Sequence, residues 1–503
     1  MAKTTKNEIA PTRAEDFPNW YQAVVKEADL AEMAHVRGCM VIKPWGYGIW
    51  EQTKACLDEQ IKKTGHENVY FPLLIPLDYL EKEAEHVEGF AKEMAVVTHH
   101  RLVARDGRLV PDPDAQLDTP LVIRPTSETV IGASFADWIQ SYRDLPLKIN
   151  QWANIVRWEM RPRVFLRTAE FLWQEGHTAH ATEEEALQET RAMLEMYRGV
   201  LQDKLAIPVI AGEKPASERF PGAVSTLSVE AMMQDYKALQ AGTSHYLGQN
   251  FAAAAGISFA DEQGQEQLVY TTSWGVSTRL IGGVIMTHAD DNGLRVPPKI
   301  SPYHVVVVPF HDKDGEDPAV SAYIEGLVQE LGACFFDEHA VRVHADTRPY
   351  RAIDKRWQWV KKGVPIILEV GRRDMEGDAV SYFCRHRFPH KALSLSRGDF
   401  VGGVGALLAE IQGEYYAEAS ERLQRHTRTD VADFEALCDH FEATKATADF
   451  VRGLWCESPQ CEQRLQPLAV SIRCLPFEQE RREGACLLCG AAATKEAVFA
   501  RSY

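Results

Sequence analysis

The stretch that decides the fold is Ile155-Val156-Arg157-Trp158-Glu159, followed after a turn at Pro162 by Phe165-Leu166-Arg167-Thr168-Ala169-Glu170-Phe171-Leu172-Trp173-Gln174-Glu175. The two runs predict a pair of strands. Side chains alternate between the faces of a strand, so Arg157 and Glu159 share one face, and Phe171, Trp173 and Glu175 share another. A guanidinium, an aromatic ring and carboxylates on one surface suit a nucleoside triphosphate, with arginine on phosphate and the ring on purine. The alternative is an amphipathic hairpin with a charged surface.

The composition indicates a large chain of several domains. A length of 503 residues exceeds one ordinary core, so we expect two to four domains, and an apolar share of 45% is typical of globular proteins. Residues 1–16 are polar, and the longest purely apolar strand-like run, Val305 to Val308, is too short to span a bilayer. We therefore expect a cytoplasmic location and no membrane partner.

The net charge of -17 argues against sequence-independent coating of nucleic acid, which depends on excess lysine and arginine. Local basic runs such as Arg385-His386-Arg387 leave room for a basic face on an acidic body. Each run is equally compatible with a solvated surface, the commoner meaning of clustered charge.

Four of the ten cysteines form two close pairs, Cys456 with Cys461 and Cys486 with Cys489, about 25 residues apart. In a cytosolic chain this spacing is typical of a structural tetrahedral zinc site. Four thiolates fill the coordination shell, so such a site has no open position for catalysis. The alternative is four free thiols.

The pattern of apolar residues predicts four segments: a tail over residues 1–16 and domains over 17–298, 299–408 and 409–503. Helices and short strands alternate up to Pro297-Pro298, including a helix at Trp45 to Lys63 and one that starts at Thr182 with the apolar stripe Leu187, Leu194, Tyr197, Leu201 and Leu205. Beyond the two prolines, strands at 305–308, 341–343 and 365–370 alternate with helices near 319–331 and 352–361. That order predicts a small, partly parallel sheet covered by helices, closed by a helix near 399–411.

The order Arg-x-Glu, turn, Arg-x-x-x-Phe-x-x-x-Glu resembles the second signature motif of the class II aminoacyl-tRNA synthetases. The amino-acid sequence from Leu166 to His177 resembles that of the prolyl-tRNA synthetase branch, in the form shared by archaea, eukaryotes and some bacteria. Residues 61–76 resemble the first motif and residues 272–279 the third, although Thr278 stands where many relatives have an acidic residue. About 60 residues separate Glu175 from Gln240, too few for the editing insertion of the other bacterial-type enzymes.

The resemblance covers essentially the whole chain and implies an α+β and α/β multidomain fold. Its parts are an antiparallel-sheet class II catalytic domain, an α/β anticodon-binding domain and a small C-terminal zinc-binding α/β domain. It implies a homodimer, joined through the first motif, that activates L-proline with ATP and Mg²⁺ to prolyl-adenylate and transfers proline to tRNA(Pro).

Two other functions remain open from the sequence. One is a relative that charges another small amino acid such as threonine, although no paired zinc ligands occur in the catalytic segment. The other is a synthetase-like RNA-binding or regulatory protein without catalysis. It is disfavoured because the candidate site residues are intact: Arg157, Arg279, Thr126 and Glu128.

In adenylate formation the attacking carboxylate is already ionised, so the protein has to position the reactants and offset negative charge. The resemblance assigns Arg157 and Arg279 as catalytic residues. It assigns proline to Thr126, Glu128, Arg157, Trp173, His245 and Gly275, and ATP to Arg157, Glu159, Arg167, Thr168, Phe171, Gln240, Thr243, Ser277 and Arg279. The predicted ligands of the structural zinc are Cys456, Cys461, Cys486 and Cys489.

Glu369 and Arg372 are the candidates for contact with the tRNA anticodon. A carboxylate accepts hydrogen bonds from base amino groups, and a guanidinium suits guanine. The alternative is ordinary surface charge at the end of a strand.

Overall fold

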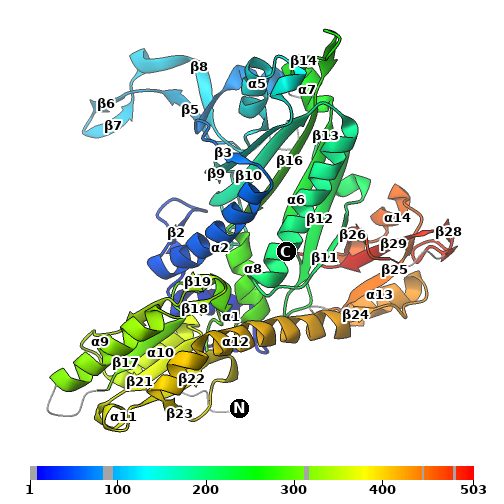
Figure 1. Ribbon diagram of the computed structural model, residues 1–503. Helices are drawn as coiled ribbons and strands as arrows, with labels where there is room; N and C mark the ends of the chain where they lie inside the picture. Colours follow the sequence, from blue (N-terminus) through cyan, green and yellow to red (C-terminus); the bar gives the residue numbers. More distant parts are fainter. Residues whose placement is uncertain (1–7, 83–93, 311–316, 444–446, 480–482) are drawn as a thin grey trace.

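The computed structural model describes residues 8–82, 94–310, 317–443, 447–479 and 483–503. Figure 1 shows a central body with an arm at the upper left, a lobe at the lower left and a second lobe at the right. Of the tail expected over residues 1–16, residues 1–7 lie outside the described residues. From there Ile9 is buried, and its amide donates to Asp291 O at 2.7 Å.

A sheet of described strands in the order β24-β25-β29-β26-β11-β12-β13-β16-β10-β9-β3 forms the centre of the molecule. Its neighbours are antiparallel except at the two ends, where β24 pairs with β25 and β3 with β9 in parallel. The bounds are β3 (Glu67–Asn68), β9 (Leu147–Val156), β10 (Glu170–His180), β11 (Val209–Glu213), β12 (Ser225–Met232), β13 (Ala238–Gly248), β16 (Tyr270–Ser277), β24 (Thr427–Arg428), β25 (Phe450–Trp455), β26 (Ser471–Pro476) and β29 (Lys495–Ala500).

The hairpin that the sequence predicts is β9 and β10, but its first strand is shorter than expected. It ends at Val156, so placing Arg157 and Glu159 on a strand face was wrong; both lie in the loop over residues 157–169. The loop closes where Arg157 N donates to Ala169 O at 2.8 Å, and it turns at Phe165, whose φ is 61°. Pro162 lacks an N–H for a ladder, which favours a loop here.

Helices pack on this sheet, with α6 along one face in Figure 1. The helices of the body are α1 (Phe17–Glu27), α2 (Pro44–Lys63), α5 (Glu128–Trp138), α6 (Glu183–Asp203), α7 (Asn250–Ala255) and α8 (Arg279–His288). Short hairpins accompany them, β1 (Ala31–Met33) with β2 (Met40–Ile42) and β14 (Ser258–Ala260) with β15 (Glu266–Leu268).

The helix that the sequence predicts from Thr182 is α6, and the side chain of Thr182 caps it by accepting a hydrogen bond from Glu185 N at 3.3 Å. Most of its predicted stripe is buried, but Leu187 is 38% exposed, so its placement in the core was wrong. The buried side of the first half carries Glu189 instead, which pairs with Lys148 and His66.

The arm is made of strands that leave the body. A three-stranded sheet, β4 (Leu74–Pro76), β8 (Gln116–Ile123) and β5 (Val96–His99), carries the hairpin of β6 (Leu102–Arg105) and β7 (Arg108–Pro111), and α3 (Leu77–Lys82) follows β4.

The lower lobe has the predicted alternation of strands and helices. Its sheet has the order β20-β17-β21-β22-β23, parallel from β20 to β21 and antiparallel beyond. The bounds are β17 (Val305–Pro309), α9 (Pro318–Gly332), β18 (Phe335–Phe336), β19 (His339–Ala340), β20 (Val343–Ala345), α10 (Ala352–Lys362), β21 (Ile366–Val370), α11 (Arg372–Glu376), β22 (Ala379–Cys384) and β23 (Leu393–Ser396).

One long helix, α12 (Arg397–Arg425), joins the two lobes across the body (Figure 1). The sequence expectation of an end near Ile411 was wrong, because the buried residues Tyr415 and Ala419 continue the apolar stripe of the helix. Residue 408, the expected domain boundary, therefore lies inside this helix.

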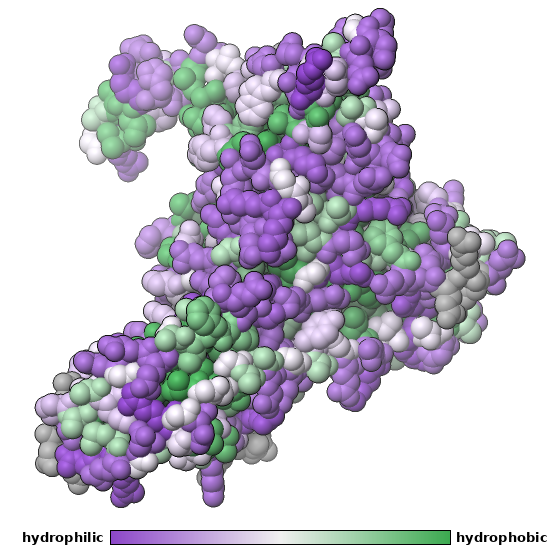
Figure 2. All heavy atoms as spheres, viewed as in Figure 1, coloured by the Kyte–Doolittle hydropathy of each residue, from purple (hydrophilic) through white to green (hydrophobic). Residues whose placement is uncertain are grey.

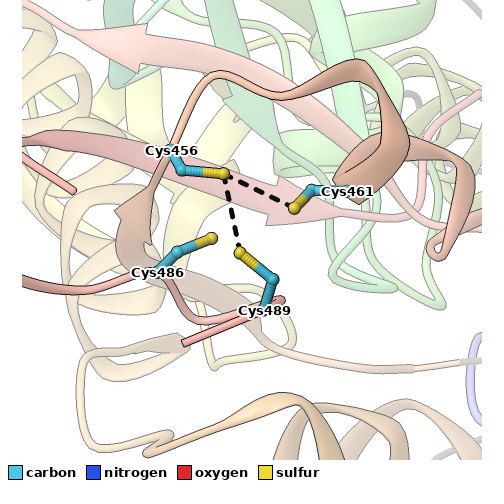
Figure 3. Close-up of side chains that lie close together, drawn as sticks. All are labelled: Cys456, Cys461, Cys486 and Cys489. Atoms are coloured by element: carbon cyan, nitrogen blue, oxygen red, sulfur yellow. Dashed lines mark hydrogen bonds between the residues drawn. The ribbon is translucent and has the colours of Figure 1, made fainter. Parts of the chain in front are cut away.

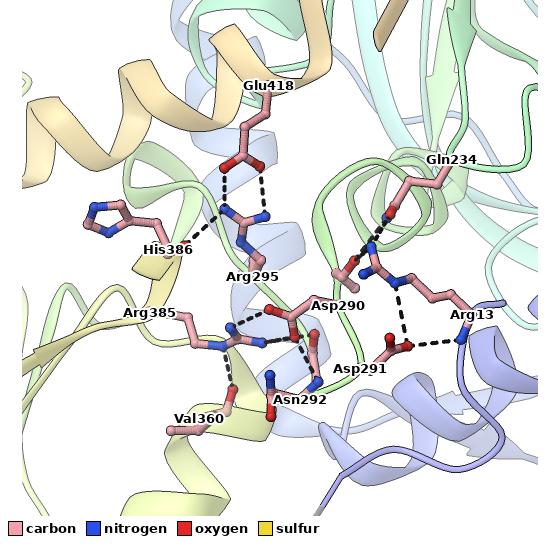
Figure 4. A network of polar contacts seen from close by, with 12 residues as sticks. Arg13, Gln234, Asp290, Asp291, Asn292, Arg295, Val360, Arg385, His386 and Glu418 are labelled. Atoms are coloured by element: carbon pink, nitrogen blue, oxygen red, sulfur yellow. Dashed lines mark hydrogen bonds and ion pairs between the residues drawn. The ribbon is translucent and has the colours of Figure 1, made fainter. Parts of the chain in front are cut away.

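An ion pair, drawn in Figure 4, and hydrogen bonds to a backbone carbonyl hold α12 on the body. Arg295 forms two contacts with Glu418, at 2.8 and 3.0 Å, and its guanidinium lies 4.4 Å from the ring centre of Tyr415. Arg422 donates twice to Thr287 O, at the end of α8.

The right lobe consists of α13 (Phe434–Ala443), α14 (Pro459–Gln463), β27 (Gly484–Ala485), β28 (Ala492–Ala493) and the strands β24, β25, β26 and β29. Strands β24, β25, β29 and β26 continue the central sheet, because β26 pairs with β11 of the body, whereas β27 and β28 form a small sheet of their own. The close approach of β26 to β11 requires a glycine at position 212, because a Cβ on Gly212 would lie 2.4 Å from Leu475 O. Among the described helices, none is both long and apolar enough to cross a membrane.

Candidate active site

A cavity of about 260 Å³ lies on the central sheet and gathers most of the predicted site residues. The predicted residues that line it are Thr126, Glu128, Arg157, Phe171, Trp173, Gln240, Thr243, His245, Gly275, Ser277 and Arg279. They come from β10, β13, β16, the loop before α5 and the first residue of that helix, the residue after β9 and the first residue of α8. Neighbouring strands thus bring together motifs that lie far apart in the sequence.

Two arginines give the cavity a positive region. Arg157 Nε donates to Pro125 O at 2.9 Å, and its guanidinium lies 5.8 and 5.4 Å from the ring centres of Phe171 and Trp173. Arg279 Nε donates to Leu166 O at 3.2 Å. Burial, with Arg167 and Arg157 nearby, lowers the pKa of Arg279 to about 10. Closely placed, desolvated cations of this kind are stabilised by an anionic ligand.

Glu128 and Thr126 form the negative region of the same cavity. Thr126 Oγ1 donates to Glu128 Oε2. Glu128 begins α5, so its backbone is fixed by the helix. A carboxylate here is a suitable partner for an ammonium group.

Trp173 and His245 supply flat rings to the wall of the same cavity. Burial, with a contribution from His177, lowers the pKa of His245 to about 3, so the ring is neutral at physiological pH. Its Nδ1 lies 3.0 Å from Thr226 Oγ1. A neutral ring and an indole suit a small apolar group that carries a positive charge.

A buried network includes two residues of the cavity wall, Glu175 and His177. Glu175 Oε1 accepts from Ser127 Oγ at 2.5 Å and from Gln151 Nε2 at 2.7 Å, and Glu175 Oε2 lies 3.4 Å from His177 Nε2. Burial alone would raise the pKa of Glu175, but the hydrogen bonds and the charge of His177 lower it. The network therefore holds a carboxylate next to Arg157.

Three predicted ATP residues do not line this cavity: Glu159, Arg167 and Thr168. Arg167 is exposed and lies 3.7 Å from Glu159 in the loop over residues 157–169. Thr168 is buried, and its Oγ1 donates to Glu170 O at 2.7 Å. These residues lie in the loop and do not contribute to the cavity wall.

The sequence interpretation missed part of the wall. Glu218, Arg219 and Phe220, between β11 and β12, line the cavity together with His177, Thr226 and Ser273. The Phe220 ring lies 4.8 Å from the ring of His245. A lone phenylalanine in a loop bounded by prolines was the one available signal, and it has no periodicity.

The four paired cysteines converge in the right lobe (Figure 3). Their sulfur atoms all lie within 4.8 Å of one another; Cys456 Sγ is 3.5 Å from Cys461 Sγ and 3.7 Å from Cys489 Sγ. Zinc–sulfur bonds of about 2.3 Å in a tetrahedron place thiolates about 3.8 Å apart. The backbone amide of Ala491 lowers the pKa of Cys489 to about 7, which favours a thiolate. The cluster is able to hold a metal ion.

His386, Glu410 and Glu414 form a second close group. Here Arg387 binds both carboxylates, at 2.6 and 2.5 Å. This group is an ion-pair network that already contains its own cation.

The two anticodon candidates lie in the lower lobe, and both have charged partners. Arg356 Nη1 is 3.0 Å from each carboxylate oxygen of Glu369, on β21. Arg372, which begins α11, pairs with Asp317 at 2.6 Å.

Comparisons with known proteins agree with this architecture. Residues 113–288 match the family "tRNA synthetase class II core domain (G, H, P, S and T)", residues 304–406 match "Anticodon binding domain", and residues 438–503 match "Prolyl-tRNA synthetase, C-terminal". The chain is 56% identical to the proline–tRNA ligase of Paramagnetospirillum magneticum, over all of both chains. It is 52% identical to that of Rhodopirellula baltica, over 100% of this chain and 99% of the relative.

A solved structure is also similar. The prolyl-tRNA synthetase of Cryptosporidium parvum in complex with L-proline and AMP superposes with a TM-score of 0.87 at 35% identity, over 99% of this chain and 98% of that one. The three matched regions lie in order along the body, the lower lobe and the right lobe, which we call from here on the catalytic body, the anticodon-binding lobe and the C-terminal lobe. The two relatives named above match over essentially their full lengths. The chain therefore belongs to the proline–tRNA ligase family of class II aminoacyl-tRNA synthetases, which are ATP-dependent.

Proposed function

We propose that the cavity binds L-proline at Glu128 and ATP at the two arginines, so that prolyl-adenylate forms between them. The observation that carries this is the presence of opposite charges in one cavity, namely the carboxylate of Glu128, which accepts from Thr126, and the guanidinium groups of Arg157 and Arg279. Trp173 and His245 enclose the pyrrolidine ring, and Gly275 leaves the backbone open to it.

In this proposal the proline carboxylate attacks the α-phosphorus of ATP, a new O–P bond forms, and pyrophosphate leaves with the electrons of the broken bond. Arg157 lies between the two ligands and offsets charge on the attacking carboxylate and the α-phosphate. Arg279 binds the outer phosphates, and Mg²⁺ bound with ATP supplies further positive charge. Phe171 stacks on the adenine, and Gln240, Thr243 and Ser277 provide hydrogen bonds around the nucleotide.

Glu159, Arg167 and Thr168 act from the loop over residues 157–169 when ATP is bound. Their support is position: the loop begins at Arg157, and Arg167 contributes to the electrostatic environment of Arg279. Movement of this loop toward the nucleotide is required for direct contact.

The experiment that tests the proposed site is ATP–pyrophosphate exchange with each of the twenty amino acids. We expect the highest kcat/KM with proline. A higher value with threonine or another amino acid would contradict the assignment of the cavity to proline, and no exchange at all would favour a non-catalytic relative.

We propose that Glu369 and Arg372 read the anticodon of tRNA(Pro). Glu369 is partly exposed at 18% of its side-chain surface, and Arg356 fixes its carboxylate. The substitution Glu369→Gln should raise KM for tRNA in aminoacylation and leave the rate of ATP–pyrophosphate exchange unchanged. The same KM for tRNA in the Glu369→Gln variant and the wild-type protein would contradict this role.

We propose that the cysteine cluster holds a structural Zn²⁺. The four sulfur atoms leave no position for a substrate, and the cluster lies in a lobe that the cavity does not include. Zinc in a one-to-one ratio by elemental analysis of freshly purified protein is the expected result.

We propose that the chain is of the archaeal and eukaryotic-like form that lacks the bacterial editing insertion. The described segment between β10 and β13 holds α6, β11 and β12 with short connections, and one similar solved structure is eukaryotic. The expected result is slow deacylation of alanyl-tRNA by the purified protein. Rapid deacylation would contradict it.

We further propose a cytoplasmic homodimer. The first-motif region and the arm expose large apolar side chains, including Tyr70 at 74%, Leu109 at 70% and Leu102 at 59%. Figure 2 shows apolar surface on the projecting arm. A second copy would cover such a surface. Sedimentation should give a mass of twice 56.6 kDa.

A further inference from the structure

The pocket loop, residues 214–224 between β11 and β12, shapes part of the cavity. It supplies Glu218, Arg219 and Phe220 to the wall and contains one short turn, Ala216–Glu218. Phe220 N donates to Thr226 Oγ1 at 3.0 Å, the same oxygen that contacts His245. The position of this loop therefore determines the space beside His245.

Three buried charges lie where the pocket loop begins. Lys214, the first residue of the loop, is 1% exposed, and its Nζ lies 2.7 Å from Glu230 Oε1 on β12. Arg473 donates to Glu230 Oε2 from both Nε and Nη2, at 3.1 Å each. Glu230 is fully buried and also accepts from Ser228 Oγ at 3.0 Å. We call Lys214, Glu230 and Arg473 the buried triad.

The triad connects two parts of the molecule. Arg473 lies on β26, in the C-terminal lobe, whereas Glu230 and Lys214 belong to the catalytic body. The backbones meet at the same place, because β26 pairs with β11 and Phe477 N donates to Ala211 O at 3.0 Å. β11 leads directly into the pocket loop.

The charges of the triad do not balance by themselves, since two cations share one carboxylate. Glu218 Oε2 lies 4.0 Å from Lys214 Nζ and supplies a second negative charge. Glu218 is itself a cavity residue. A continuous series of charged groups thus runs from Arg473 through Glu230 and Lys214 to the cavity wall.

Removal of one member of a buried ion network leaves its partners uncompensated, and they move or admit water. Without Arg473, Lys214 would be the remaining cation at Glu230, and its alternative contact with Glu218 would weaken. Because Lys214 N also donates to Thr226 O at 2.8 Å, a shift of Lys214 is transmitted to the wall around His245.

We propose that the C-terminal lobe positions the pocket loop for recognition of the amino acid through Arg473, Glu230 and Lys214. This rests on the proposed binding of proline beside Glu128 and His245. Arg473 is accordingly a positioning residue, and it does not contact the substrate.

The test compares full-length Arg473→Met and Arg473→Lys in ATP–pyrophosphate exchange. We expect Arg473→Met to raise KM for proline about tenfold and to change KM for ATP by less than about threefold. Arg473→Lys, which keeps the charge, should recover most of the loss. Hydrogen exchange of peptides from residues 214–224 should become faster in Arg473→Met.

Arg452→Met is the matched control, because Arg452 forms an ion pair of 2.7 Å with Glu496 inside the C-terminal lobe. It should keep KM for proline at the wild-type value. If Arg473→Met does not fold, Lys214→Met is measured in its place, with the same expected selectivity for proline.

Equal increases in KM for ATP and proline would overturn the proposal, as would unchanged KM values together with unchanged exchange of the pocket loop. Loss of thermal stability alone would assign the triad to domain attachment only. Wild-type protein without proline-dependent exchange would instead show that the proposed substrate is wrong.

Discussion

Arg385 and Asp290 form a bidentate ion pair, with nitrogen–oxygen distances of 2.8 and 2.5 Å, between the anticodon-binding lobe and the catalytic body (Figure 4). The Arg385 side chain is fully buried and also donates to Val360 O and Gly293 O. Burial alone would raise the pKa of Asp290, but the charge and hydrogen bonds of Arg385 lower it. The pair remains charged while it holds the two parts together.

Arg385→Met should destabilise the junction, because it leaves the Asp290 carboxylate, which is only 18% exposed, without its cation. Breaking a buried pair typically costs about 3–5 kcal/mol. Urea unfolding followed by tryptophan fluorescence would detect it as a lower midpoint of the first transition. Arg351→Met, which removes an exposed pair with Asp354, is the control and should not shift the midpoint. Equal effects of the two variants would contradict a special role for the buried pair.

Arg157→Ala should nearly abolish proline-dependent pyrophosphate exchange, since the proposed reaction loses the cation shared by carboxylate and α-phosphate. Loss of such a partner typically costs about 10²-fold or more in rate. Arg161→Ala, an exposed arginine in the same loop, serves as the control and should keep near-normal exchange. Near wild-type exchange by a folded Arg157→Ala protein would refute the catalytic assignment.

Glu128→Gln should raise KM for proline much more than KM for ATP, because it removes the negative charge opposite the proposed ammonium. Initial rates of exchange with each substrate varied in turn give both constants. A change confined to ATP would mean that Glu128 acts as a helix residue or a nucleotide ligand.

Cys486→Ser should release the metal and loosen the C-terminal lobe, because a closed thiolate site contributes to folding. Elemental analysis measures the metal, and limited proteolysis measures the loosening. Cys438→Ser, in the same lobe but outside the cluster, should retain the metal. Absence of zinc in native protein would refute the site.

Stability should fall as the pH is lowered below 6.5, because several buried histidines are neutral in the native state. Burial lowers the pKa of His288 from 6.5 to about 3. Between these values the unfolded chain binds one more proton at this site, so unfolding becomes easier by about 1.4 kcal/mol per pH unit. His288→Gln should flatten the dependence of Tm on pH between 6.5 and 5, and His339→Gln, at an exposed site, should not.

The sequence predicted chemistry better than boundaries. Phe171, Trp173 and Glu175 were placed on one face from alternation alone, and they all line the cavity. Arg157 was placed on a strand because its neighbours are apolar and β-branched, yet the ladder ends at Val156; the hydrogen bond to Ala169 that closes the loop has no sequence pattern.

Contacts between distant segments could not be predicted from the sequence for a similar reason. Arg473 and Glu230 are separated by 243 positions, so no local spacing relates them. Leu187 fitted a helical stripe, but the fold turns Glu189 inward to meet Lys148 and His66. Such choices depend on partners that only the tertiary structure provides.

The pairing of β26 with β11 has a consequence for attempts to divide the protein. A chain shortened after Arg425 would lose β26 and expose the backbone groups at the end of β11, from Ala211 to Glu213, that β26 now pairs. An uncovered edge of this kind templates strand addition between molecules. The shortened protein would therefore tend to aggregate through β11, and the catalytic body cannot be treated as a module that is cut free at the end of α12.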